Sequence, residues 1–162
     1  MRRCLPWPDA RLRRAAGPVA EITDEIRALW SDMIDTMEAM PGLGLAAPQI
    51  GAMLRLAVVD ASETRGQAVR MANPEILHAS IALRAHDEGS PNLPGVSARI
   101  VRPRAVTVRF VNDRGAQEER DFVGLWATSV QHQIDHLQGK MYFDRLSKVK
   151  RDILLRRARK IA

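Results

Sequence analysis

Hydrophobic and polar positions alternate along the chain with two different periods, and the longer period predicts helices near both ends. In residues 21–40, apolar side chains recur every three or four positions, which predicts an amphipathic helix with one buried face. Thr23 or Asp24 is suited to cap the start of this helix. The same period predicts two further helices, over residues 124–139 and 147–161, of which the second is charged and amphipathic.

Between these helices the pattern changes to that of β-strands. Extended segments are predicted over residues 54–60, 68–76, 76–89, 104–113 and 116–123. The last two are joined by residues 112–115, Asn-Asp-Arg-Gly, which is typical of a hairpin turn. Residues 42–51 and 87–96 are rich in glycine and proline and are predicted to be tight connections. The order of elements predicts one α+β domain with mainly antiparallel sheet, with residues 1–147 as its body and residues 148–162 as a basic C-terminal helix.

Composition excludes several classes of protein. The 162 residues are 46% hydrophobic and 27% charged, which is typical of a globular domain. No apolar run is long enough to span a bilayer, and no apolar segment of a signal peptide follows the basic N-terminus. Cys4 is the only cysteine, so no internal disulfide can form. We therefore expect a cytoplasmic protein that does not enter membranes.

The net charge of +6 is concentrated at one end of the chain. Residues 148–162 contain seven Lys or Arg and one acidic residue, whereas residues 1–147 contain 18 basic and 18 acidic residues. A cationic helix can bind a polyanion, or it can simply be a solvated face. The charge pattern leaves both interpretations open.

Candidate chemistry begins with the sequence HQIDH at residues 132–136. His132 and His136 are four positions apart, so on a helix they share one face and can bind one metal ion. Metallohydrolases with this spacing usually have a glutamate after the first histidine, and here that position holds Gln133. On its own, such a pair is more often two exposed or hydrogen-bonded imidazoles than a metal site.

Three stretches taken together resemble the peptide deformylase family, metallohydrolases that remove the formyl group from a nascent N-terminal methionine. The family motifs GxGLAAxQ, EGCLS and HExDH correspond to GLGLAAPQ (42–49), EGSPN (88–92) and HQIDH (132–136). The resemblance covers nearly the whole chain. It implies an α+β fold in which antiparallel strands pack around a central HxxxH helix, flanked by an N-terminal and a C-terminal helix.

The resemblance also implies a metal site, and the chain departs from it at one ligand. The family holds its metal with two histidines, matched by His132 and His136, and with a cysteine whose position is Ser90. A serine hydroxyl stays neutral near pH 7 and coordinates weakly compared with a thiolate. We therefore expect a chain without a metal cofactor, and at most one zinc or iron ion held weakly.

Two further departures affect the catalytic groups that the resemblance implies. Gln133 replaces the glutamate that carries the proton, and an amide cannot do so. Pro91 replaces a leucine whose backbone N–H stabilises the oxyanion, and proline has no N–H. Gln49 matches the family glutamine whose side chain donates to the same oxyanion.

By the same resemblance, a pocket for the methionine side chain lies between the glycine-rich segment and the helix turn before the histidines. Its predicted residues are Leu43, Gly44, Leu125, Thr128 and Ser129. Thr128 and Ser129 make this wall more polar than is common in the family, so a preference for methionine is in doubt.

These observations predict a peptide deformylase-like protein that has lost deformylase activity and binds a peptide N-terminus of the formylmethionyl type. The alternative is a metal-dependent hydrolase, a weak or altered deformylase that uses His132, His136 and Ser90. Resemblance further suggests that the basic helix of residues 148–162 contacts the ribosome and its RNA.

Overall fold

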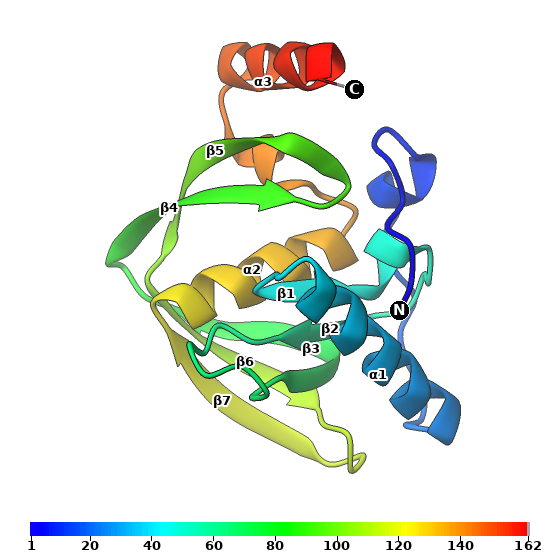
Figure 1. Cartoon of the computed structure of the whole chain (residues 1–162). Coiled ribbons are helices and arrows are strands. Elements are labelled where there is room, and N and C mark those ends of the chain that lie inside the picture. Colours follow the sequence, from blue (N-terminus) through cyan, green and yellow to red (C-terminus); the bar gives the residue numbers. More distant parts are fainter. Residues whose placement is uncertain (162) are drawn as a thin grey trace.

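In the computed structural model, which describes residues 1–161, one helix lies between two antiparallel sheets (Figure 1). This helix, α2 (Leu125–Leu137), is the predicted HxxxH helix, and eleven of its thirteen residues are buried. A helix enclosed on all sides needs few charged positions, which explains the mixture of apolar and small polar residues in its sequence. The predicted α+β fold with a central helix is confirmed.

The larger sheet has five strands in the order β1-β2-β3-β6-β7, and every neighbouring pair is antiparallel. Its strands are β1 (Gly44–Ala46), β2 (Leu56–Val59), β3 (Val69–Ala79), β6 (Ala105–Val111) and β7 (Gln117–Val123). The turn between β6 and β7 is the predicted one: Asn112 N–H donates to the carbonyl of Ala116, and Gly115 has a positive φ of 77°. The smaller sheet pairs β4 (Leu83–Ser90) with β5 (Leu93–Pro103).

Helices α1 (Asp24–Ala39) and α3 (Lys148–Ile161) lie at the two sides of this arrangement (Figure 1). Thr23 caps α1 as predicted, because its side chain accepts a hydrogen bond from Ile26 N–H at 3.3 Å. Short 3-10 helices complete the chain: η1 (Ala10–Arg13), η2 (Ala47–Ile50) and η3 (Tyr142–Arg145). No helix among these residues is long and apolar enough to cross a membrane.

Two predicted connections proved to contain strands. Residues 42–51 include the short strand β1, and the expected loop of residues 87–96 contains the end of β4, a tight turn and the start of β5. The prediction failed there because Pro94 and Gly95 usually interrupt strands, whereas β5 lies in a two-stranded sheet where proline is tolerated.

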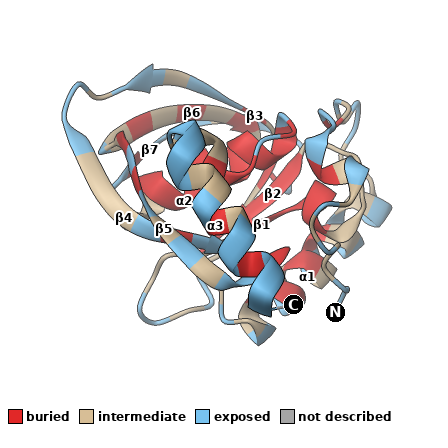
Figure 2. Cartoon of the chain, turned by 90° about the horizontal axis from the view of Figure 1, so that it is seen from above, coloured by how far each residue is buried: buried red, intermediate tan, exposed pale blue. Residues whose placement is uncertain are grey.

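Helix α3 packs on the smaller sheet through a narrow apolar face. Leu154 and Ala158 are buried against β5 and η3, whereas Val149 and Ile153 are exposed. Figure 2 shows α3 on the outside of the molecule and the buried residues concentrated in α2 and the strands around it. Ala162, the last residue of the predicted basic segment, lies outside the described residues.

The C-terminal end of α2 is fixed by Gly139, and we predict that this position does not accept alanine. Gly139 has φ +76°, and a Cβ there would be 2.6 Å from the carbonyl oxygen of Arg13. Gly139→Ala should therefore lower the free energy of unfolding by about 1–3 kcal/mol beyond the cost of the unfavourable φ, because backbone cannot move aside cheaply.

The matched control is Gly115→Ala. Gly115 has nearly the same φ, +77°, but nothing lies within 4 Å of the added Cβ. Urea denaturation of both variants measures the difference, and equal losses of stability would contradict the proposed steric contact.

Candidate active site

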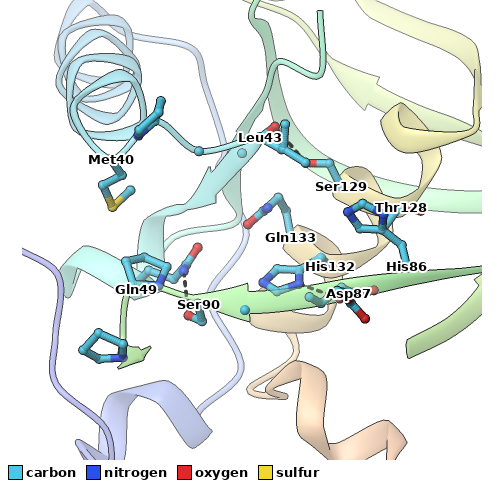
Figure 3. A pocket seen from close by; sticks show the side chains of 17 residues that line it. Met40, Leu43, Gln49, His86, Asp87, Ser90, Thr128, Ser129, His132 and Gln133 are labelled. Atoms are coloured by element: carbon cyan, nitrogen blue, oxygen red, sulfur yellow. Dashed lines mark hydrogen bonds and ion pairs between the residues drawn. The ribbon is translucent and has the colours of Figure 1, made fainter. Parts of the chain in front are cut away.

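A cleft of about 460 Å³ opens between the glycine-rich segment, the β4–β5 turn and α2 (Figure 3). It brings together most of the predicted site residues: Leu43, Gly44, Gln49, Ser90, Pro91, Thr128, Ser129, His132 and Gln133. Leu125, which the resemblance placed in the pocket, is not among the lining residues. His136 lies below the cleft and is almost fully buried.

The two histidines converge as their spacing predicts. Nε2 of His132 and Nε2 of His136 are 3.2 Å apart. Burial, followed by the charges of His132 and Arg102, holds the pKa of His136 well below its ordinary value, so this ring is neutral. His132 is oriented from its other side, where Nδ1 lies 2.8 Å from Oε1 of Glu88.

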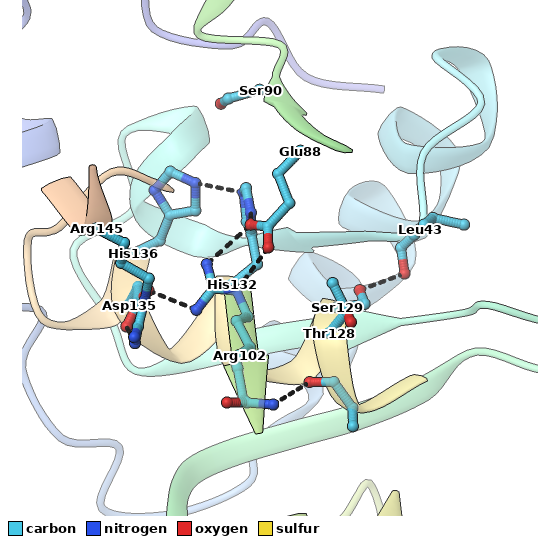
Figure 4. A network of polar contacts seen from close by, with 12 residues as sticks. Leu43, Glu88, Ser90, Arg102, Thr128, Ser129, His132, Asp135, His136 and Arg145 are labelled. Carbon is cyan, nitrogen blue, oxygen red and sulfur yellow. Dashed lines mark hydrogen bonds and ion pairs between the residues drawn. The ribbon is translucent and has the colours of Figure 1, made fainter. Parts of the chain in front are cut away.

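Glu88 belongs to a buried charge network that the sequence analysis did not anticipate (Figure 4). Arg102 donates to both oxygens of Glu88, at 2.6 and 2.8 Å, and to Oδ2 of Asp135 at 2.9 Å. Burial raises the pKa of Glu88, but hydrogen bonds from Arg102 and His132 outweigh this and hold it at about 2. The ionised carboxylate can only accept, so Nδ1 of His132 carries the proton that is donated to Glu88.

A second polar cluster holds Ser90 and Gln49. The Ser90 hydroxyl donates to Oδ1 of Asn92 at 3.0 Å and accepts from Nε2 of Gln49 at 3.4 Å. The same Gln49 amide donates to Asn92 Oδ1 at 2.8 Å, and Gln49 Oε1 accepts from Ala46 N–H. Both side chains, for which the sequence suggested a metal-binding and an oxyanion-binding role, are thus hydrogen-bonded to one another and to Asn92.

Gln133 lies in the cleft against the backbone of β1. A Cβ on Gly44 would be 2.6 Å from Gln133 Nε2 and 2.7 Å from Ser129 Oγ, so only glycine allows the amide to lie there. Oε1 of Gln133 is buried and has no hydrogen-bond partner within residues 1–161. An unpaired buried acceptor is costly unless a bound molecule supplies a donor.

The histidine pair fits a metal ion. Two imidazole nitrogens bound to one tetrahedral zinc ion stand about 3.4 Å apart, and the observed separation is 3.2 Å. In the described part of the chain, no three His, Cys, Asp or Glu side chains are grouped to hold a metal. A third protein ligand must therefore be of another type, and Ser90, at the position of the family's cysteine, is the candidate because its hydroxyl lines the same cleft.

The fold and this cleft define a class of protein, namely α+β proteins in which a central helix brings two histidines together beside an open cleft. The sequence profile of the polypeptide deformylase family matches residues 1–152. A peptide deformylase of Afipia carboxidovorans is 42% identical over 164 residues, which cover 100% of this chain and 96% of that protein.

Solved structures agree with this match. The crystal structure of a peptide deformylase from Legionella pneumophila has a TM-score of 0.93 and 38% identity, covering 99% of this chain and 95% of its own. The peptide deformylase of Ehrlichia chaffeensis in complex with actinonin has a TM-score of 0.92 and 32% identity, covering 99% and 96%. The chain belongs to the polypeptide deformylase family.

These relatives correct three predictions. The prediction that the chain has lost enzymatic activity was wrong, because proteins similar over its full length are peptide deformylases. The prediction that it lacks a metal cofactor was wrong for the same reason, because the family consists of iron- or zinc-dependent hydrolases. The expectation that the chain is not an enzyme was likewise wrong. The alternative of a metal-dependent hydrolase is better supported.

Sequence reasoning missed Glu88, Asp135 and Arg102, which form the charged network behind His132. A signal was present, since Asp135 stands within the HQIDH motif and Arg102 directly follows the apolar pair Ile100 and Val101. Which acid Arg102 joins could not be deduced, because Glu88 and Asp135 are 14 and 33 residues away from it.

We predict that Arg102→Met strongly destabilises the protein. Arg102 is fully buried, and its removal leaves Glu88 and Asp135 as buried carboxylates without their shared counter-ion. Breaking such a group costs about 3–5 kcal/mol of unfolding free energy. Thermal or urea denaturation measures this loss.

The control is Arg109→Met, which removes an arginine from a neighbouring strand. Arg109 pairs with the exposed Glu75 at 3.4 Å, and an exposed pair contributes about 0–1 kcal/mol. Similar stabilities for the two variants would show that the buried network does not hold the fold together.

Proposed function

We propose that the protein is a metal-dependent deformylase with an altered active site, acting on formylmethionyl peptide N-termini in the cytoplasm. The observation that supports this most is the convergence of two imidazole nitrogens 3.2 Å apart beside an open cleft. The peptide deformylases that match the full chain support the substrate class. The actinonin complex of the Ehrlichia relative supports the binding of a ligand by this fold.

In this proposal His132 and His136 hold one zinc or iron ion through their Nε2 atoms, and the Ser90 hydroxyl is the third protein ligand. The ion, when bound, supplies a Lewis acid that activates water toward the formyl carbonyl. Glu88 and Arg102 keep the His132 ring in the tautomer that leaves Nε2 free to bind metal. For Ser90 to ligate, its hydroxyl must turn away from Asn92, which makes metal binding weaker than with a thiolate.

We further propose that Ser90, Pro91 and Gln133 slow the reaction without changing its class. The Gln133 amide can accept an N–H from the substrate on its unpaired Oε1, but it cannot carry a proton to the leaving nitrogen. Pro91 gives no backbone donor to the developing oxyanion. Gln49 becomes that donor when its amide leaves Asn92.

The protein loaded with zinc, iron(II) or cobalt(II) should release formate from formyl-Met-Ala-Ser, and Gln133→Glu should raise kcat. A carboxylate at this position restores proton transfer, a contribution of about 10²–10⁴ in rate in other enzymes. A coupled formate dehydrogenase assay under anaerobic conditions measures the turnover of both forms.

His136→Ala should abolish this turnover and weaken metal binding, whereas His78→Ala removes an exposed histidine of β3 and should change neither. Metal content after dialysis against limiting zinc provides a readout independent of activity. Failure of every metal-loaded form, including Gln133→Glu, to release formate would overturn the proposed function.

We also propose that α3 binds ribosomal RNA. Of its seven cations, all but Arg151 are exposed, and they extend along the outer side of the helix. Leu154 and Ala158 anchor the helix, so its charges are held in a fixed arrangement. Such a surface suits a phosphate backbone.

Replacing Arg156, Arg157 and Lys160 by serine should weaken co-sedimentation with ribosomes and make it less dependent on salt, because fewer counter-ions are released on binding. Truncating the helix is a poorer test, since Leu154 and Ala158 belong to the core. The control changes three exposed arginines elsewhere to serine: Arg104, Arg114 and Arg120. An equal effect of both triple changes would indicate unspecific attraction only.

A further inference from the structure

The end of the cleft farthest from Gln49 has a polar wall. Thr128 and Ser129 lie on α2 one helical turn before His132 and Gln133, and His86 of β4 lines the cleft beside them (Figure 3). Thr128 and Ser129 belong to the pocket predicted for the first side chain of a peptide whose reacting group lies at His132.

The hydrogen bonds of the wall leave two donors free. Ser129 is not one of them, because its hydroxyl donates to the carbonyl of Leu43 at 2.8 Å. The Thr128 oxygen accepts from Nη1 of Arg84 at 3.1 Å, and its own hydrogen has no acceptor among residues 1–161. His86 makes no hydrogen bond to any of these residues and has a ring N–H to offer.

Thr128 has 4% of its surface exposed, so water reaches its hydroxyl only through the cleft. An apolar side chain that fills the cleft excludes this water and leaves the donor unsatisfied. A side chain with an oxygen acceptor satisfies it. The exposed Asp87, which lines the cleft, and Arg84, whose Nη1 lies 3.1 Å from the Thr128 oxygen, bring opposite charges to this region, so an uncharged acceptor fits it best.

We infer that Thr128 and His86 select a first side chain bearing a neutral oxygen acceptor, such as the sulfoxide of oxidised methionine, over an apolar one. The inference rests on the proposed function, since it takes the formyl end of the peptide to lie at His132. It makes Thr128 and His86 specificity-determining residues of the cleft.

The test compares formyl-Met(sulfoxide)-Ala-Ser with formyl-norleucyl-Ala-Ser on the zinc-loaded protein. We expect kcat/KM to favour the sulfoxide by about threefold to tenfold, the value of one hydrogen bond to a neutral donor. Thr128→Val, which keeps the shape and removes the hydroxyl, and His86→Phe should each reduce this ratio. The control Thr107→Val removes an exposed threonine hydroxyl bonded to Asp121 on β7 and should leave the ratio unchanged.

Binding of the corresponding N-acetyl peptides, measured by calorimetry, separates this inference from the proposed function. Selective binding of the sulfoxide peptide without turnover of any formyl peptide would support the selective wall and reject the deformylase. If both formyl peptides are turned over and kcat/KM for the norleucyl peptide is equal or higher, the selection by Thr128 and His86 is rejected. The proposed deformylase activity is then unaffected. The absence of both binding and turnover would overturn both.

Discussion

The buried guanidinium of Arg102 is the interaction on which the rest of the site depends. It lies on β5, reaches Glu88 on β4 and Asp135 on α2, and is fully buried (Figure 4). Charges in such a place are tolerated only when each has a partner, so the spacing between the small sheet and the central helix is tightly fixed. Glu88 in turn fixes the orientation of the His132 ring through a 2.8 Å hydrogen bond.

His132 and the altered residue Ser90 are consequently held by separate hydrogen-bond networks. His132 is positioned by Arg102 and Glu88, whereas Ser90 and Gln49 are hydrogen-bonded to Asn92. A change at Ser90 thus leaves the contacts of His132 in place. The chain can differ from the family motif at Ser90 and still hold two imidazole nitrogens 3.2 Å apart.

The fold was largely predictable because its helices and its β6–β7 hairpin carry local signals. Thr23 caps α1, and residues 112–115 form the expected turn. Strand β5 was missed because Pro94 and Gly95 argue against a strand unless the partner strand is known. The polar network was missed because its pairings join residues far apart in sequence, whereas the positions of His132 and His136 followed directly from helical geometry.

The mistaken prediction of lost activity has a physical cause. It treated the three changed residues as parts that the reaction cannot lack, although each contributes only a fraction of a typical enzymatic acceleration. An oxyanion donor is worth about 10²–10³ and a proton carrier about 10²–10⁴, whereas enzymes accelerate reactions by about 10⁶–10¹⁷. Under the proposed function, the cleft would still position a substrate and the two imidazoles would still hold a metal ion. We therefore expect the residues at positions 90, 91 and 133 to alter the rate and the metal affinity of the site more readily than they change its chemistry.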